Sequence, residues 1–208
     1  MKNLLFLSVI LIYFSFNLKG QEFEKEIKNA LKTTPMLDFR LDSRNSFISS
    51  SNVRIFGIKL GLQYDNKISI GLGYNQLVSE LNNNEIRLGD SLYSGRLNYN
   101  YLSPYIEYIF YQDKQWEFSI PVQFGVGNTF YSNNNENQPS ELYRKTVISY
   151  EPAIIFQYRF LKYFGAGMGV GYRLMIIPNK NIEERFTSPV YLFKFKVYFQ
   201  ELYGDILD

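Results

Sequence analysis

The sequence predicts an all-β protein, an eight-stranded antiparallel up-and-down transmembrane β-barrel with a short N-terminal helix. The main observation lies between Thr146 and Ile177, where apolar residues alternate with small or charged ones along two long segments. Such alternation is the period-two pattern of β-strands. Soluble strands average about 5–6 residues, whereas longer strands that are apolar on one face suit lipid outside and a crowded lumen inside. The order of the loops and the placement of aromatic residues favour the same fold.

The chain begins with the pattern of a secretory signal peptide. Lys2 precedes an apolar run from Leu4 to Phe16, and the small residue Gly20 stands before Gln21. The run is shorter than the roughly 20 residues that a spanning helix needs. We therefore expect a signal peptide at 1–20, a periplasmic N-terminal segment at 21–34, an outer-membrane β-barrel at 35–199 and a periplasmic C-terminal tail at 200–208.

The segment 21–34 has a weak helical pattern. Phe23, Ile27, Ala30 and Leu31 are spaced to share one side of an amphipathic helix, with Glu and Lys between them. A frayed, soluble tail is the alternative interpretation of these residues.

Eight strands are predicted in the barrel segment. They cover Pro35 to Asp42, Val53 to Tyr64, Lys67 to Ser79, Arg96 to Phe110, Trp116 to Tyr131, Thr146 to Phe160, Phe164 to Ile177 and Pro189 to Phe199. The apolar faces carry, in the same order, Leu37, Phe39 and Leu41; Phe56, Ile58, Leu60 and Leu62; Ile68, Ile70, Leu72 and Tyr74; Leu102, Ile106, Tyr108 and Phe110; Trp116, Phe118, Ile120, Val122, Phe124 and Val126; Ile148, Tyr150, Pro152, Ile154, Phe156, Tyr158 and Phe160; Phe164, Ala166, Met168, Val170, Tyr172, Leu174 and Ile176; and Tyr191, Phe193, Phe195, Val197 and Phe199.

The connections between these strands are of two kinds. Turns near 65–67, 111–115 and 161–163 are short, whereas loops 43–52, 80–95, 132–145 and 178–188 are long. Asp65, Asn66 and Lys67 have the composition of a tight hairpin turn. An even strand number with short turns at one rim and long loops at the other is the layout of a bacterial outer-membrane barrel.

Aromatic residues make up 18% of the chain and gather beside the short turns. The group consists of Tyr64, Tyr108, Phe110, Tyr111, Trp116, Tyr158, Phe160, Tyr163, Phe164 and Phe199. Aromatic rings at membrane boundaries lie between oil and water, so this grouping indicates a girdle at one interface.

With these features the chain resembles the small eight-stranded outer-membrane barrels of the OmpA/OmpX transmembrane-domain type, and more loosely an uncharacterised outer-membrane β-barrel domain. The resemblance covers Pro35 to Phe199 and rests on architecture. It implies localisation in the outer membrane of a Gram-negative bacterium, with lipid around the barrel. Such barrels often finish at an aromatic residue, whereas here Phe199 is followed by Gln200 to Asp208.

The composition excludes several kinds of chemistry. The chain has no His and no Cys, so histidine-based catalytic triads and disulfides are impossible. Without Lys2 and Lys19 the 22 basic residues become 20, equal to the 20 acidic ones, which gives no electrostatic reason to bind nucleic acid. We expect no enzyme, no catalytic residue, no metal, no cofactor and a monomer.

The inward charges form the candidate site, a charged network in the lumen. Its residues are Arg40, Lys59, Glu107, Glu117, Glu151, Arg159, Arg173, Lys194 and Lys196, joined by Asp38 and Asp42. An eight-stranded barrel leaves room only for side chains, and unpaired charges there are costly. The inward glycines Gly165, Gly167, Gly169 and Gly171 are interpreted as space for larger lumen side chains.

Two local features make sharp predictions. Pro104, Pro121 and Pro152 cannot donate to a ladder, so they predict a band of bulges or unpaired ladder across three successive strands. A three-residue turn at Leu161 to Tyr163 sets cross-strand partners whose numbers sum to 324. Glu151 and Arg173 then lie opposite each other, and Arg173→Met alone is predicted to cost more than changing both, because Glu151 loses its partner. Arg159, opposite Gly165, is free to cross the lumen toward Glu107 or Glu117.

Three functions fit this reading. The first is a non-enzymatic outer-membrane barrel, structural or presenting its loops to an extracellular ligand or envelope protein. The second is a narrow pore for ions or small solutes, since both signs of charge point inward. The third is a lipid-modifying enzyme that works through Glu107, Glu117 and Glu151. A soluble envelope sandwich is the alternative fold, because it would offer the three prolines edge strands.

Overall fold

The structure is a computed structural model that describes residues 20, 22–48, 51–79, 82–88, 91–132, 141–181 and 185–199, with the backbone alone at 51, 82–88 and 91–95. Its strands are β1 (Met36–Ile48), β2 (Ser51–Tyr64), β3 (Ile68–Leu77), β4 (Asn82–Leu88), β5 (Ser91–Gln112), β6 (Trp116–Ser132), β7 (Glu141–Arg159), β8 (Phe164–Ile177) and β9 (Ser188–Tyr198). A short helix at 22–30 precedes them. No helix in the described ranges is long and apolar enough to cross a membrane.

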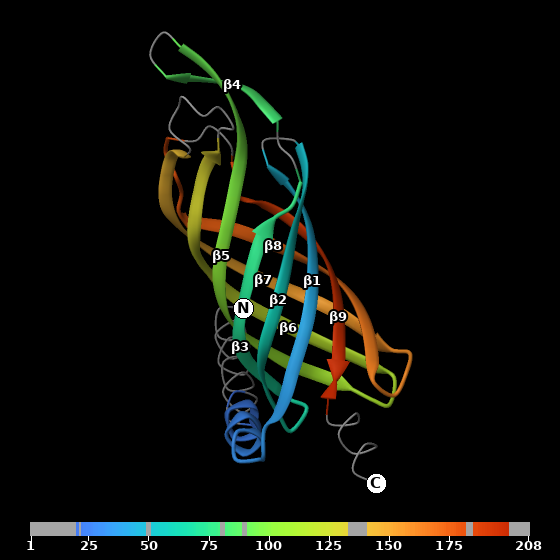
Figure 1. Ribbon diagram of the computed structural model, residues 1–208. Coiled ribbons are helices and arrows are strands. Elements are labelled where there is room, and N and C mark those ends of the chain that lie inside the picture. The colour runs from blue at the N-terminus through green and yellow to red at the C-terminus, as the bar shows by residue number, and fades with distance from the viewer. Residues whose placement is uncertain are drawn as a thin grey trace, which may run out of the picture.

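Eight of the strands close into an antiparallel ring (Figure 1). β1 pairs with β2 on one side and with β9 on the other, and β3 pairs directly with β5. β4 pairs with the first part of β5 alone and stands outside the ring, as a hairpin that rises beyond one end of the barrel (Figure 1). The predicted fold class, an eight-stranded antiparallel barrel with a short N-terminal helix, is confirmed.

The three short turns lie where the sequence places them, all at the end of the barrel that carries the N-terminal helix (Figure 1). Between β2 and β3, Asp65 and Asn66 have φ angles of 49° and 51°, the left-handed conformation that a type I′ hairpin turn requires and that Asn and Asp tolerate. After β5, the backbone amides of Trp116 and Gln115 donate to Asp113. These two bonds lower the pKa of that carboxyl, so the turn is held by its charged form.

Three of the predicted long loops are wrong in extent, and in 132–145 the difference is that 141–145 already belong to β7. The segment 43–52 is largely strand, since β1 continues to Ile48 and β2 starts at Ser51. Within 80–95, β4 and the start of β5 form the protruding hairpin. The sequence gives no clear apolar sign that β1 continues past Asp42, because the side chains of 43–46 are all polar. Arg44 and Ser46 point into the lumen, where inward strand positions can be polar.

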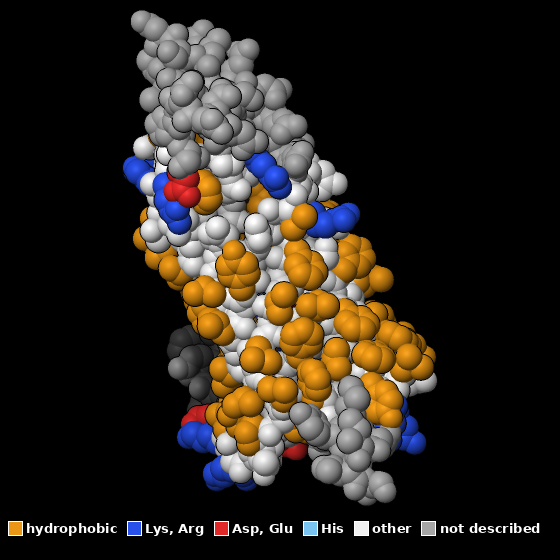
Figure 2. All heavy atoms as spheres, in the orientation of Figure 1, with side chains coloured by type: hydrophobic (Ala, Val, Ile, Leu, Met, Phe, Trp, Pro, Cys, Tyr) orange, Lys and Arg blue, Asp and Glu red, His pale blue; other side chains and the backbone are white. Residues whose placement is uncertain are grey.

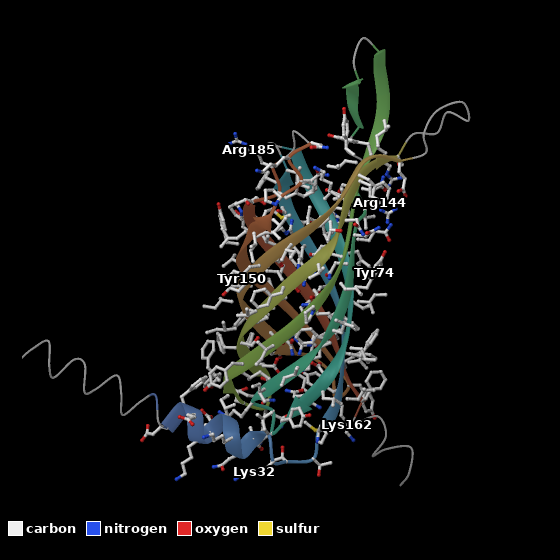
Figure 3. The ribbon with its side chains drawn as sticks, turned by 90° about the vertical axis from the view of Figure 1, so that its left-hand side faces the viewer. Lys32, Tyr74, Arg144, Tyr150, Lys162 and Arg185 are labelled. Atoms are coloured by element: carbon white, nitrogen blue, oxygen red, sulfur yellow. The ribbon has the colours of Figure 1, made fainter. Side chains whose placement is uncertain are left out.

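Along each ring strand, side chains alternate between a buried lumen set and an exposed apolar set. The exposed set includes Leu60 and Leu62 on β2, Leu72 on β3 and Phe193 on β9. Figure 2 shows these side chains as a broad hydrophobic band over the barrel wall, with Lys and Arg beyond it at both ends. Tyr74 and Tyr150 point outward from the middle of the barrel, whereas Arg144 and Arg185 lie at one end and Lys162 at the other (Figure 3). Exposing so large an apolar surface to water is unfavourable, so the band is suited to contact with lipid.

Aromatic rings pack together at the short-turn end of β5, β6 and β7. Trp116 stacks on Phe156 with ring centroids 4.6 Å apart, and its ring lies 4.4 Å from that of Tyr158. Phe118 contacts both Phe156 and Tyr111. These contacts form a continuous aromatic strip beside the short turns, where the sequence predicts a girdle at a membrane interface.

The predicted β7–β8 register is confirmed. Arg159 pairs with Gly165, Ala153 with Gly171 and Tyr150 with Leu174, so each pair sums to 324 and Glu151 lies opposite Arg173. The prolines interrupt the ladder on one side without shifting it. Pairing is absent at Pro104 toward β6, at Pro121 toward β7 and at Pro152 toward β8, although the register is the same on both sides of each gap. The unpaired band is confirmed, and the register shifts fall elsewhere, near Ile109, Thr129 and Ile148.

The inward glycines provide space, as the sequence predicts. A Cβ on Gly169 would lie 2.4 Å from the carbonyl oxygen of Ile154, and one on Gly61 would lie 2.5 Å from the Tyr105 hydroxyl. Both distances are too short for real atoms, so a side chain at either place would displace the wall or Tyr105.

The N-terminal helix is attached to the outside of the barrel at the short-turn end. The Glu26 carboxylate lies 2.8 Å from the Lys67 ammonium in the β2–β3 turn and accepts a 2.9 Å hydrogen bond from the Tyr108 hydroxyl on β5. The Phe23 ring meets the Tyr108 ring edge-on, with centroids 4.9 Å apart. The helix thus bridges the β3–β5 seam.

Acidification is expected to release this helix. The bonds from Lys67 and Tyr108 lower the pKa of Glu26 below its ordinary value of 4.5. The attachment is therefore fully present above about pH 4.5 and is lost as the pH falls through the lower pKa of the docked state. Tryptophan emission from Phe23→Trp, in a Trp116→Phe background, should report the release below pH 4.5. With Glu26→Gln the transition should disappear, and a transition that persists there would contradict the assignment.

Candidate functional site: the charged lumen

The candidate site is a set of ionised side chains that seven ring strands point into the lumen. Eight of the nine predicted residues are buried there, namely Arg40, Lys59, Glu107, Glu117, Glu151, Arg173, Lys194 and Lys196. Asp38, Asp42 and Arg44 join them from β1. Strand alternation puts all of these residues on inward positions, and the narrow ring brings opposite walls within contact distance.

Glu107 on β5 is the centre of one cluster. Its carboxylate accepts a 2.9 Å hydrogen bond from the Lys194 ammonium on β9, forms an ion pair with Arg40 and accepts a hydrogen bond from the Ser119 hydroxyl. Arg40 is shared, since its guanidinium also donates to Asp38. Four strands are therefore tied across the lumen by a single carboxylate and the guanidinium beside it.

Glu117 on β6 lies beside this cluster. Its two oxygens lie 3.3 Å from the Lys196 ammonium and 3.7 Å from that of Lys194. Lys194 thus lies between Glu107 and Glu117 and joins the two carboxylates.

Glu151 on β7 is the centre of a second cluster. It accepts a 2.9 Å hydrogen bond from Nε of Arg173, lies 2.8 Å from Nε of Arg44, and accepts a 3.0 Å hydrogen bond from the Gln123 amide. The predicted cross-strand ion pair with Arg173 is confirmed. The added presence of Arg44 and Gln123 means that Glu151 has three partners rather than one: two hydrogen-bond donors, Arg173 and Gln123, and an ion-pair partner, Arg44.

Arg44 connects the second cluster to β1 and β2. Its Nη2 lies 2.6 Å from Asp42, and Asp42 in turn lies 3.0 Å from the Lys59 ammonium. Its Nη1 donates to the Asn75 amide oxygen at 2.6 Å. The ring of Tyr105 closes the gap between the clusters, because the Arg40 guanidinium and the Lys59 ammonium each lie 4.8 Å from its centre, a cation–π distance.

Arg44 is absent from the predicted network because the first predicted strand ends at Asp42. The signal was nevertheless present, since Asp38, Arg40, Asp42 and Arg44 alternate in sign at every second residue. That spacing places all four on one strand face.

Arg159 takes a different position from the one predicted. Its guanidinium donates to the backbone carbonyl of Lys162 in the β7–β8 turn and lies 4.4 Å from the centre of the Tyr198 ring. It therefore stays at the short-turn rim instead of crossing toward Glu107 or Glu117. The reason is its place at the end of β7, where the backbone carbonyl of Lys162 in the turn is within reach.

Above the charged layer, toward the protruding hairpin, the lumen is filled by an apolar plug. We use this name for Ile48, Val53, Ile55, Leu77, Leu97, Tyr99, Tyr101, Tyr131, Leu142, Val147 and Phe186. Tyr99 stacks on Tyr101 at 4.6 Å and meets the Phe186 ring at 5.0 Å. The plug meets the second cluster at Arg173, whose guanidinium lies 6.0 Å from the Tyr99 ring centre.

The remaining space is small. Between the clusters, a cavity of about 10 Å³ is lined by Arg40, Asp42, Arg44, Lys59, Pro121, Gln123, Glu151, Ala153, Ile155, Leu192 and Lys194. This volume is about what one water molecule needs. A larger hollow of about 80 Å³ opens at the short-turn rim beside Gln63, Lys196 and Tyr198.

The arrangement has clear chemical consequences. Within the described residues, the lumen buries six cations against five carboxylates, and every one of those carboxylates has a cation within ion-pair distance. No group of three or more His, Cys, Asp or Glu side chains in those ranges is placed to hold a metal ion. Strong pairing makes the network a set of cross-links between strands.

Together, the closed antiparallel ring, the apolar outer band and the filled lumen define a small transmembrane β-barrel. No protein-family model matches the chain, and no curated protein sequence matches it either. Neisserial surface protein A (NspA) is structurally similar over 79% of this chain and 96% of its own, at 10% identity and a TM-score of 0.52.

Two further solved structures are similar at lower scores. The N-terminal β-barrel domain of OprF from Pseudomonas aeruginosa is 11% identical over 79% of this chain and 98% of its own, with a TM-score of 0.46. Ail, the attachment invasion locus protein of Yersinia pestis, is 11% identical over 78% of this chain and 96% of its own, with a TM-score of 0.48. The resemblance to small eight-stranded outer-membrane barrels is confirmed at the level of the fold by the closed ring of eight strands and by the similarity to NspA.

Proposed function

We propose that this chain is an outer-membrane β-barrel protein of a Gram-negative bacterium with a closed lumen, and that it acts as a structural or surface-interaction module. The single observation that carries the proposal is the double filling of the lumen by the ion network and the apolar plug. The signal-peptide pattern at 1–20 and the lipid-compatible outer band support the location.

A closed lumen argues for a barrel that holds its position rather than one that conducts. A permeating ion would have to displace Arg40 from Glu107 and Arg44 from Glu151, and then pass the stacked rings of Tyr99 and Tyr101. Breaking one buried ion pair costs about 3–5 kcal/mol, so a path through both clusters meets a high barrier.

The same contacts argue against lipid-modifying chemistry. Glu107, Glu117 and Glu151 are buried on the lumen side of the wall, each beside a cation. A general base must come within about 3 Å of the proton that it removes, and the barrel wall separates these carboxylates from the lipid around the band.

The surface role belongs to the rim that carries the β4–β5 hairpin. β5 is 22 residues long, and its first part leaves the ring to pair with β4, so the backbone there extends beyond the barrel (Figure 1). In the proposed orientation this rim faces the outside and presents the hairpin to an extracellular ligand or an envelope protein. The barrel itself contacts outer-membrane lipid as a monomer.

The test is conductance in planar bilayers, with a general porin reconstituted in parallel as the positive control. Insertion of the folded chain should leave the current at the baseline. Discrete ion-selective steps would instead establish the narrow pore. Faster migration of unboiled than boiled protein on a denaturing gel, and fractionation with outer membranes, check that the protein is folded and located as proposed.

A further inference from the structure

The N-terminal helix lies against the outer wall of the barrel at the height of the apolar band. Ile68 and Ile70 are successive outward positions on β3, yet Ile70 is 42% exposed and Ile68 only 3%. Ile68 pairs across the ladder with Tyr108, and Tyr108 is the residue that Phe23 and Glu26 contact. The helix therefore covers a corner of the apolar band, rather than hanging below it in the aqueous phase.

The helix has three distinct faces. Successive residues turn by about 100°, so Glu26 and Ala30 share the face toward the barrel, where Ala30 is buried. Phe23 lies at the edge of that face, between Ala30 and Ile27. Ile27 and Leu31 lie about a quarter turn away from that face, and the helical bond from the Leu31 amide to the Ile27 carbonyl continues the helix to this point. Lys25 and Asn29 are exposed on the opposite side.

One of these faces is apolar and, within the described residues, remains largely exposed. Phe23 is 48% exposed and Leu31 42% exposed, at either end of a strip that Ile27 completes. The strip continues the lipid-facing band directly, because Phe23 packs on Tyr108 and the next outward residue of β5 along the barrel, Ile106, is itself exposed. Figure 3 shows the helix extending away from the short-turn end of the barrel, at a large angle to the barrel axis.

We propose that the strip Phe23, Ile27 and Leu31 rests on the phospholipids of the periplasmic leaflet, with the helix lying in the membrane interface. Interfacial helices insert their apolar face by about 5–10 Å at the boundary between headgroups and acyl chains. The barrel face, the lipid strip and the polar face then point toward wall, membrane and periplasm in turn. Glu26, held by Lys67 and Tyr108, fixes the helix at this height.

The experiment places one tryptophan on each side of the helix in the full-length folded protein. Trp116 is the chain's single tryptophan, so Trp116→Phe gives a blank background. Leu31→Trp reports the strip, and Asn29→Trp is the uncharged control on the polar face. Each variant is reconstituted into phosphatidylcholine vesicles with and without acyl-chain bromine, and acrylamide is the aqueous quencher. Heat-modifiable migration checks the fold.

The two positions should respond in opposite ways. Leu31→Trp should be quenched severalfold more by brominated lipid than Asn29→Trp, and Asn29→Trp severalfold more by acrylamide. Equal acrylamide quenching at both positions would place the strip in water and overturn the proposal. Protection of Leu31→Trp without bromine quenching would also overturn it, since protein or a second copy would then cover the strip. Quenching of native Trp116 by brominated lipid tests separately whether the barrel is in the bilayer.

Discussion

Replacing Glu151 with Met is expected to destabilise the barrel by about 3–5 kcal/mol, more than replacing Arg173 with Met. Within the described residues, Glu151 is the one carboxylate within ion-pair distance of Arg173. Glu151→Met therefore leaves a buried guanidinium without its anion, which is the costly way to break an ion pair.

Arg173→Met has the milder consequence because Glu151 keeps two partners. Arg44 lies 2.8 Å from it and Gln123 donates at 3.0 Å. This overturns the sequence-based expectation that Arg173→Met leaves Glu151 unpaired. The double variant removes both buried charges and leaves Arg44 with Asp42, so it should be more stable than Glu151→Met alone.

Urea titration of the three variants in lipid vesicles measures this order, with the folded fraction read from the unboiled gel band. We expect the wild type to be the most stable and Glu151→Met the least stable, with Arg173→Met and the double variant between them. A Glu151→Met protein as stable as Arg173→Met would contradict the prediction, because it would show that the contacts of Glu151 do not stabilise the folded barrel more than those of Arg173.

Replacing Tyr99 with Ala is expected to cost about 3–5 kcal/mol, the range for removing a large aromatic side chain from a packed core. Tyr99 is buried in the apolar plug, stacked on Tyr101 and edge-on to Phe186. The substitution would leave a cavity that lipid chains cannot fill, because Tyr99 is buried inside the barrel and surrounded by protein.

Tyr74→Ala is the matched control, since Tyr74 points outward from β3 and is exposed (Figure 3). Lipid chains can fill the space that it leaves, so the same urea titration should show a much smaller loss. Tyr99→Ala should also leave the bilayer current at the baseline, because the ion network closes the lumen independently. Channel openings in Tyr99→Ala would show that the plug alone closes the barrel.

The sequence by itself determined the barrel, its strand number and the β7–β8 register. These follow from local rules: side chains alternate at every second residue, turn residues such as Asp65 and Asn66 adopt left-handed backbone, and an apolar face must meet an apolar solvent. The inward, opposed positions of Glu151 and Arg173 follow from the length of the turn between their strands and from the alternation of side chains along each strand.

Only the tertiary structure decided which charges meet. Lys194 binds Glu107 from a strand 87 residues away, and Arg44 reaches Glu151 and Gln123 from the far wall. Parity gives the direction of a side chain, whereas its partner depends on the stagger and closure of the whole ring. The same limit applies to Arg159, which a turn carbonyl captures, and to the N-terminal helix, whose place on the β3–β5 seam exists only after the ring has closed.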